Sequence, residues 1–182
     1  MGRHDESLSG AIESELAAAL EEGQISDAAL ASSGSQREMF WRLRESIPEA
    51  QRRIGASIKH DVSVMTSELP RFITEASQLV HAISPQGRIV SYGHLGDGNL
   101  HFNVSRPLDG DDESFLRLAP SINRAVHDLI ARYGGSISAE HGIGRLKREE
   151  LVRYKQPVAL DVMRAIKQAL DPNGIMNPGK VL

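Results

Sequence analysis

The chain has 182 residues, of which 40% are hydrophobic, and a formal net charge of −3 at pH 7. This length suits one domain with a sizeable core, and the charge excludes a strongly basic surface for nucleic acid. Because the chain has no cysteine, disulfides, thiolate metal sites and thiol nucleophiles are excluded. No apolar run approaches the roughly 20 residues of a membrane span. The amino end has no signal-peptide core, so a cytoplasmic location is expected.

Apolar residues that recur at three- or four-residue spacing predict five helices. In chain order they are residues 9–22, 36–50, 68–83, 113–133 and 157–170. Residues 136–151 combine a short strand, a glycine-rich turn and a helix start. No dinucleotide-binding GxGxxG motif and no phosphate loop is present, so the chain is not expected to bind a dinucleotide alone.

Alternating apolar and polar residues predict three strands. They are residues 56–64, 88–95 and 99–106. In the first strand His60 lies on the buried side and is interpreted as structural, whereas Lys59 and Asp61 lie on a polar side that is interpreted as solvated. The order of the elements predicts an α+β fold, with an antiparallel sheet and helices packed on one face.

The hairpin SYGHLGDGNLHFNV, residues 91–104, places two of the seven histidines around a Gly-Asp-Gly-Asn turn. If residues 96–99 form the turn, His94 lies opposite His101 with Cβ atoms about 5 Å apart. Tyr92 then lies opposite Asn103, and all four side chains share one face of the sheet. A shift of one residue would bury both histidines against the core, so this register is expected.

Two opposed imidazoles suit a divalent metal, and the segment SAEHGIGR supplies Glu140 and His141 as further ligands. Two histidines and one carboxylate leave coordination positions open, as a catalytic site requires. Two other interpretations stay open. The histidines could form a polar cross-strand pair on a hydrated face, and Glu140 and His141 could belong to a helix-start cluster. Asp97 is interpreted as a turn residue.

Three motifs resemble a known family. GHLGDGNLHFNV (93–104), SAEHGIGRLKREEL (138–151) and LDPNGIMNPGKVL (170–182) resemble the carboxy-terminal domain of FAD-linked oxidases of the vanillyl-alcohol-oxidase type. More narrowly, they resemble the D-lactate, glycolate and D-2-hydroxyglutarate dehydrogenase branch. FWRLRESIPEA (40–50) and SIKHDVSV (57–64) also match that branch. The motifs cover nearly the whole chain in the family's order, which makes the resemblance specific.

The resemblance implies a ferredoxin-like cap domain that closes over FAD held by a separate FAD-binding domain or subunit. Residues 1–182 are expected to be one such cap domain without the FAD-binding domain, with a tail motif at residues 172–182. The family's cap domain begins with an additional strand, so the chain is expected to be a fragment or a separate gene product truncated at its amino end. The unpaired sheet edge would favour a homo-oligomer.

The resemblance also implies a role for individual residues. In the family, the histidines of GHxGDGNxH and the glutamate of EHG bind a divalent metal, often zinc, which implies His94, His101 and Glu140 as metal ligands. The adjacent histidine, His141, is implied as the catalytic base. The resemblance thus selects a metal set from the alternatives that spacing leaves open.

The implied reaction is oxidation of a small 2-hydroxy acid to a 2-oxo acid, with hydride transfer to FAD. Arg44 and Lys59 are implied to bind the substrate carboxylate, and Asn103 to contact the substrate. Pro48 replaces a hydroxyl residue of D-2-hydroxyglutarate enzymes, which favours a shorter acid such as D-lactate or glycolate. The chain alone is expected to be inactive. The alternative is a stand-alone divalent-metal-binding module or metallohydrolase without flavin; a third is a chain that binds no metal.

Overall fold

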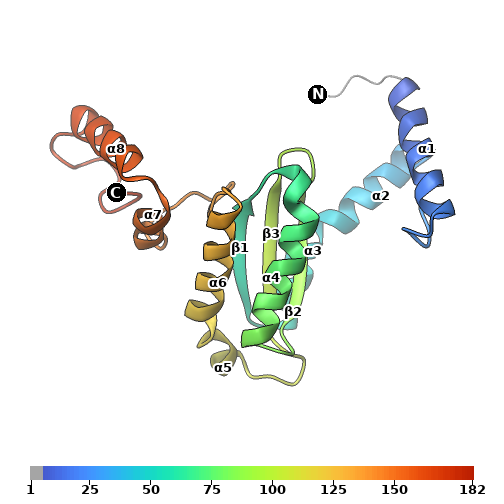
Figure 1. Ribbon diagram of the computed structural model, residues 1–182, viewed down its shortest axis with the longest axis horizontal. Coiled ribbons are helices and arrows are strands. Elements are labelled where there is room, and N and C mark those ends of the chain that lie inside the picture. Colours follow the sequence, from blue (N-terminus) through green and yellow to red (C-terminus); the bar gives the residue numbers. More distant parts are fainter. Residues whose placement is uncertain (1–5) are drawn as a thin grey trace. The chain divides into compact units, whose positions relative to one another are not determined.

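The computed structural model describes residues 6–182 (Figure 1). The chain divides into two compact units, Met1–Pro48 and Glu49–Leu182. No helix in the described part of the chain is long and apolar enough to cross a membrane.

The first unit contains α1 (Glu6–Glu21) and α2 (Gly34–Glu45), and α3 (Ile47–Ile54) spans the boundary between the units. The side chain of Ser33 caps α2 by accepting a hydrogen bond from the backbone N–H of Gln36 at 3.3 Å. The single helix predicted at 36–50 is therefore two helices. Pro48 lacks an N–H and is tolerated only in a first helical turn, which is where it lies in α3.

The second unit contains a three-stranded antiparallel sheet with strand order β1-β3-β2. Its strands are β1 (Ser57–Ser63), β2 (Arg88–His94) and β3 (Asn99–Ser105). The structure confirms the predicted α+β fold, and each strand lies within two residues of its predicted bounds. β3 pairs on both sides, so its backbone groups are satisfied within the sheet.

Two helices, α4 (Leu69–Ile83) and α6 (Ala119–Arg132), contact each other beside one face of the sheet (Figure 1). Phe72 of α4 and Val126 of α6 are fully buried with Phe102 and Val104 of β3 in one apolar cluster. Burial of each such side chain contributes about 1.5–3 kcal/mol. The remaining elements of the unit are η1 (Thr66–Glu68), α5 (Asp112–Leu116), α7 (Arg148–Tyr154) and α8 (Pro157–Leu170).

The helix predicted at 113–133 is divided into α5 and α6, with Pro120 in the first turn of α6. Polar contacts attach α7 to α6. Arg124 donates to Glu150 at 2.6 and 3.2 Å, and Glu150 lies 2.9 Å from His127 Nδ1. The hydroxyl of Tyr154 donates to Asp128 at 2.6 Å.

The hairpin register differs from the prediction by two residues. Tyr92 lies opposite His101, and His94 lies opposite Asn99, so the predicted direct pairing of His94 with His101 is wrong. The reason is a contact from outside the hairpin: Val64 N donates to Gly98 O at 3.2 Å. Because the side-chain period of a strand is two, a shift of two residues leaves every side chain on its predicted face.

Candidate functional site

The face of the sheet opposite α4 and α6 carries four rows of residues, and each row takes one residue from each strand. The rows are Asp61–His101–Tyr92, Lys59–Asn103–Val90, Ser63–Asn99–His94 and Ser57–Ser105–Arg88. Alternation along the strands puts these side chains on this face, because Val62, Phe102 and Val104 face the helices. The sheet thus separates a polar face from the apolar core.

Asp61 is the most buried carboxylate on this face, with a relative exposure of 3%. Its Oδ2 accepts backbone hydrogen bonds from Ala139 (3.2 Å), Glu140 (3.0 Å) and His141 (2.8 Å). Burial alone would raise the pKa of Asp61, but the amides of His141 and Glu140 and nearby positive charge hold that pKa below its ordinary value.

The prediction that Asp61 lies on a solvated face is therefore wrong. The segment after α6 runs beside β1, where Ser63 and Ser136 exchange backbone hydrogen bonds at 3.0 and 2.9 Å. Ala139 N also donates to the backbone oxygen of Asp61 at 3.2 Å. This segment covers Asp61, and the alternation pattern of β1 contains no sign of a cover that comes from about 75 residues later in the chain.

Glu140 lies between the two predicted histidine ligands. Its Oε1 is 3.6 Å from His94 Nδ1, and its Oε2 is 3.6 Å from His101 Nε2. The side chain of His141 is exposed, and its ring stacks beside that of His101 at 5.6 Å between centroids. Four predicted residues from two distant segments thus lie together.

His101 faces a carboxylate at each ring nitrogen. Nε2 faces Glu140, and Nδ1 lies 3.8 Å from Asp61 Oδ1. Within residues 6–182, one group of three potential ligands has donor atoms that all lie within 4.8 Å of one another: Asp61, His101 and His141. The predicted metal set of His94, His101 and Glu140 does not meet this distance criterion. Asp61 was missing from the predicted site, and His141 was predicted as a base.

The donor atoms fit a divalent metal. Imidazole nitrogen and carboxylate oxygen are the ligands that zinc uses when no thiolate is available. A second observation also points to a polar site. Asp61 Oδ1 is buried beside the imidazole of His101 and has no hydrogen-bond partner. Two alternative ligand sets share His101: one adds His94 and Glu140, and the other adds Asp61 and His141.

The predicted substrate-binding residues fall in both units. Lys59 is exposed on the same face as the histidines and lies opposite Asn103. Asn103 is buried, and its side-chain amide donates to Gln51 Oε1 of α3 at 2.9 Å. Arg44 lies on α2 in the other compact unit, and its role stays a prediction.

Asp97 is confirmed as a turn residue, because its Oδ1 accepts the backbone N–H of Asn99 at 3.0 Å. His60 is confirmed as a core residue that is 1% exposed, with Nδ1 2.8 Å from the carbonyl oxygen of Phe102. Both residues therefore have local structural functions.

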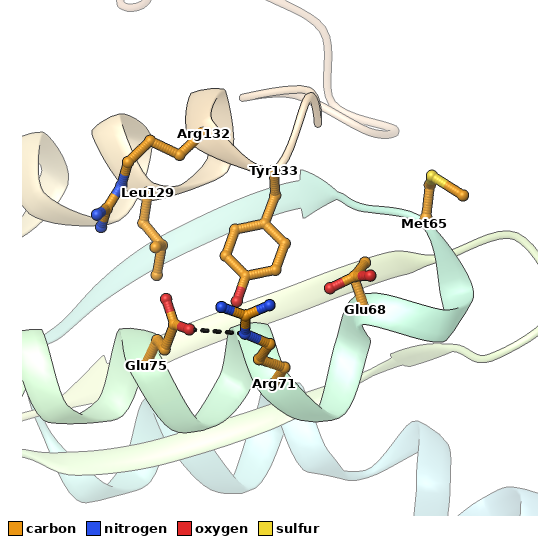
Figure 2. A pocket seen from close by; sticks show the side chains of 7 residues that line it. All are labelled: Met65, Glu68, Arg71, Glu75, Leu129, Arg132 and Tyr133. Carbon is orange, nitrogen blue, oxygen red and sulfur yellow. Dashed lines mark hydrogen bonds and ion pairs between the residues drawn. The ribbon is translucent and has the colours of Figure 1, made fainter.

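A cavity of about 430 Å³ lies on the helical side of the sheet (Figure 2). Its lining residues are Met65, Glu68, Arg71, Glu75, Leu129, Arg132 and Tyr133. Arg71 donates to Glu75 at 2.9 Å, and this pair lies next to the Tyr133 side chain (Figure 2). None of the predicted site residues lines the cavity, so it is separate from the histidine cluster.

The fold and this cluster together define an α+β domain with a candidate metal centre on one sheet face. Residues 2–181 match the family described as FAD linked oxidases, C-terminal domain. The chain therefore belongs to this family, as its motifs predicted.

Curated relatives agree with this assignment. The chain is 39% identical over 162 residues to a D-2-hydroxyglutarate dehydrogenase of Stutzerimonas stutzeri, covering 89% of this chain and 35% of that protein. It is 38% identical over 177 residues to one of Xanthomonas citri pv. viticola, covering 97% and 37%. It is 39% identical over 171 residues to the mitochondrial enzyme of Arabidopsis thaliana, covering 94% and 29%. The chain thus spans about a third of the length of these relatives.

Proposed function

We propose that this domain is the substrate- and metal-binding cap of an FAD-dependent 2-hydroxy acid dehydrogenase, with zinc as the metal. The observation that carries the proposal is the position of Glu140, whose two carboxylate oxygens each lie 3.6 Å from a nitrogen of His94 or His101. Three side chains of zinc-ligand type therefore converge on one sheet face in a domain of the FAD-linked oxidase family.

Solvent access favours this ligand set over the one that contains Asp61. A catalytic metal needs coordination positions that a substrate can reach. The side chains of His94 and Glu140 are 47% and 44% exposed, whereas that of Asp61 is 3% exposed. We therefore assign His94, His101 Nε2 and Glu140 as ligands. A divalent metal held there supplies a Lewis acid for the substrate hydroxyl.

The chain's own residues have three further roles in the proposal. His141 is exposed beside His101 and accepts the hydroxyl proton as the 2-hydroxy acid becomes a 2-oxo acid. Lys59 supplies positive charge on the same face for a substrate carboxylate. Arg44, in the other compact unit, keeps its predicted role of binding a substrate carboxylate. Asn103, fixed by Gln51, presents an amide to the substrate. FAD, held by a separate domain or subunit, is the hydride acceptor.

The names of the relatives favour D-2-hydroxyglutarate as the first substrate to test, before D-lactate and glycolate. The sequence favoured a shorter acid because of Pro48. That residue lies in the first turn of α3, which gives it a backbone role that is independent of substrate length. A cytoplasmic location stays part of the proposal, whereas the Arabidopsis relative is named as mitochondrial.

Elemental analysis of the purified chain tests the metal assignment. The wild-type protein is expected to retain one zinc ion, and His101→Ala is expected to lose it. His81→Ala is the matched control, because His81 is exposed on α4 and bonds only its local carbonyl, Gly87 O, at 3.0 Å. A wild-type protein without divalent metal, or equal metal in His101→Ala, would contradict the proposal.

Substrate oxidation tests the second part. The chain together with an FAD-binding partner domain is expected to reduce a dye with D-2-hydroxyglutarate, and His141→Asn is expected to lower kcat by about 10²–10⁴-fold. The chain alone, with free FAD and D-2-hydroxyglutarate or D-lactate, is expected to give no turnover. Turnover by the chain alone would show that no other domain is needed to position the flavin.

A further inference from the structure

We infer that Asp61 is a positioning residue that selects the metal-binding tautomer of His101, by accepting a hydrogen bond from Nδ1–H. This inference rests on the proposed function, because it takes Nε2 of His101 as the atom that faces the metal. Asp61 and His101 lie directly opposite each other on β1 and β3, so the sheet itself brings the two side chains together.

The two oxygens of Asp61 have different surroundings. Oδ2 accepts three backbone N–H groups, from Ala139, Glu140 and His141. Oδ1 is buried, has no hydrogen-bond partner, and lies 3.8 Å from His101 Nδ1. A buried carboxylate oxygen without a donor is unfavourable. A small rotation of the imidazole brings Nδ1 within hydrogen-bond range and satisfies Oδ1.

The chemistry of a neutral imidazole makes this contact selective. One ring nitrogen carries a proton and the other carries a lone pair. A proton on Nδ1 of His101 satisfies Asp61 Oδ1 and leaves the lone pair of Nε2 directed toward Glu140, 3.6 Å away. The other tautomer would place the lone pair of Nδ1 against Asp61 Oδ1, which is buried and has no other donor. Glu140, which faces Nε2, is 44% exposed, so water can satisfy its oxygens. A carboxylate behind a ligating histidine fixes its tautomer and orientation in this way.

The same carboxylate also positions the neighbouring ligand segment. The amides that bind Oδ2 belong to Glu140 and His141 themselves. One side chain of β1 therefore orients a histidine ligand through Oδ1 and holds the proposed glutamate ligand and base through Oδ2. Alternation in β1 made this residue look solvated, which is why the sequence did not reveal it.

Asp61→Asn is expected to favour the other tautomer of His101, and it preserves the shape of the side chain at position 61. The three backbone donors require an acceptor, so the carboxamide oxygen takes the place of Oδ2 and the NH₂ group faces His101 Nδ1. Nδ1 must then accept, and the proton moves to Nε2. We expect imidazole ¹⁵N NMR of the metal-free chain at pH 8 to show Nδ1–H for His101 in the wild type and Nε2–H in Asp61→Asn. We expect zinc affinity to fall about 10–100-fold.

Asp161→Asn is the control for the same carboxylate-to-carboxamide change away from the histidine cluster. Asp161 lies on α8, its side chain is 73% exposed, and it accepts a hydrogen bond from Arg164 at 3.0 Å. The zinc affinity of this variant is expected to stay within about twofold of wild type, because exposed polar contacts contribute little.

The outcomes separate the inference from the proposed function. A wild type that binds no zinc overturns the proposed function, whereas the tautomer in the metal-free chain still decides the inference. If wild-type His101 carries its proton on Nε2, the inference is overturned, even where Asp61→Asn fails to fold. Unchanged zinc affinity in a folded Asp61→Asn overturns it as well, as does zinc bound through Nδ1 of His101, which would make Asp61 a ligand.

Discussion

Acid is expected to destabilise the second unit through one buried histidine. His60 lies on the core side of β1, where its ring makes an edge contact with His127 of α6 at 5.7 Å between centroids. Burial lowers the pKa of His60 from 6.5 to about 4. The hydrogen bond to the carbonyl oxygen of Phe102 opposes this effect, and the charges of His127 and Lys147 add to it.

The pKa difference gives the sign and size of the effect. Below pH 6.5 the unfolded chain takes up a proton at His60, and the folded protein does so only near pH 4. The unfolded state therefore binds more protons in this interval, and the free energy of unfolding falls as the pH falls. At about 1.4 kcal/mol per pKa unit, the loss reaches about 3 kcal/mol near pH 4. That is a large part of the roughly 5–15 kcal/mol of a typical domain.

Urea unfolding followed by far-UV circular dichroism, from pH 7.5 to pH 4.5, measures this loss in wild type and His60→Leu. The leucine variant loses the hydrogen bond to Phe102, so it is expected to be about 1 kcal/mol less stable at neutral pH. It has no imidazole to protonate, so the order of stability is expected to reverse by about pH 5. Parallel stability curves over the whole range would refute the reasoning.

Two further variants test the packing that positions the site. Phe102→Ala removes a fully buried ring from the central strand and is expected to lower the free energy of unfolding by about 3–5 kcal/mol in urea titration; a loss below about 1 kcal/mol would contradict the assigned core. Gly98→Ala is expected to lower both stability and zinc content, because Gly98 has φ +73° and an added Cβ would lie 2.0 Å from Val64 O. Gly96→Ala meets nothing within 4 Å and is expected to change neither quantity; equal effects of the two glycine changes would sink this account.

Local patterns predicted the elements well, because helix and strand periodicity is written in neighbouring residues. The helix predicted at 157–170 is α8 within the same bounds, and the predicted strand 56–64 is β1. The same patterns predicted single helices at 36–50 and 113–133, where the structure has two helices each. Pro48 and Pro120 each lie in the first turn of a new helix, and the spacing of apolar residues alone does not reveal such a boundary.

Contacts between distant segments explain what the sequence did not predict. The register of the hairpin depends on the bond from Val64 to Gly98, and the burial of Asp61 depends on the segment at 136–141. The convergence of Glu140 on the two histidines was predicted from family motifs, and spacing within the hairpin could not supply it. The face of the sheet on which each side chain lies was predicted correctly, because it depends only on the two-residue alternation along a strand.

The same alternation also bears on how this domain can diversify. Along β3, even-numbered residues such as Phe102 contribute cohesion, and odd-numbered residues such as His101 and Asn103 contribute chemistry. A mutation at the partly exposed His101 leaves the apolar layer intact, whereas a mutation at the buried Asn103 also removes the hydrogen bond to Gln51. Within this strand, His101 is therefore the position where the chemistry can change with the smaller loss of folding free energy.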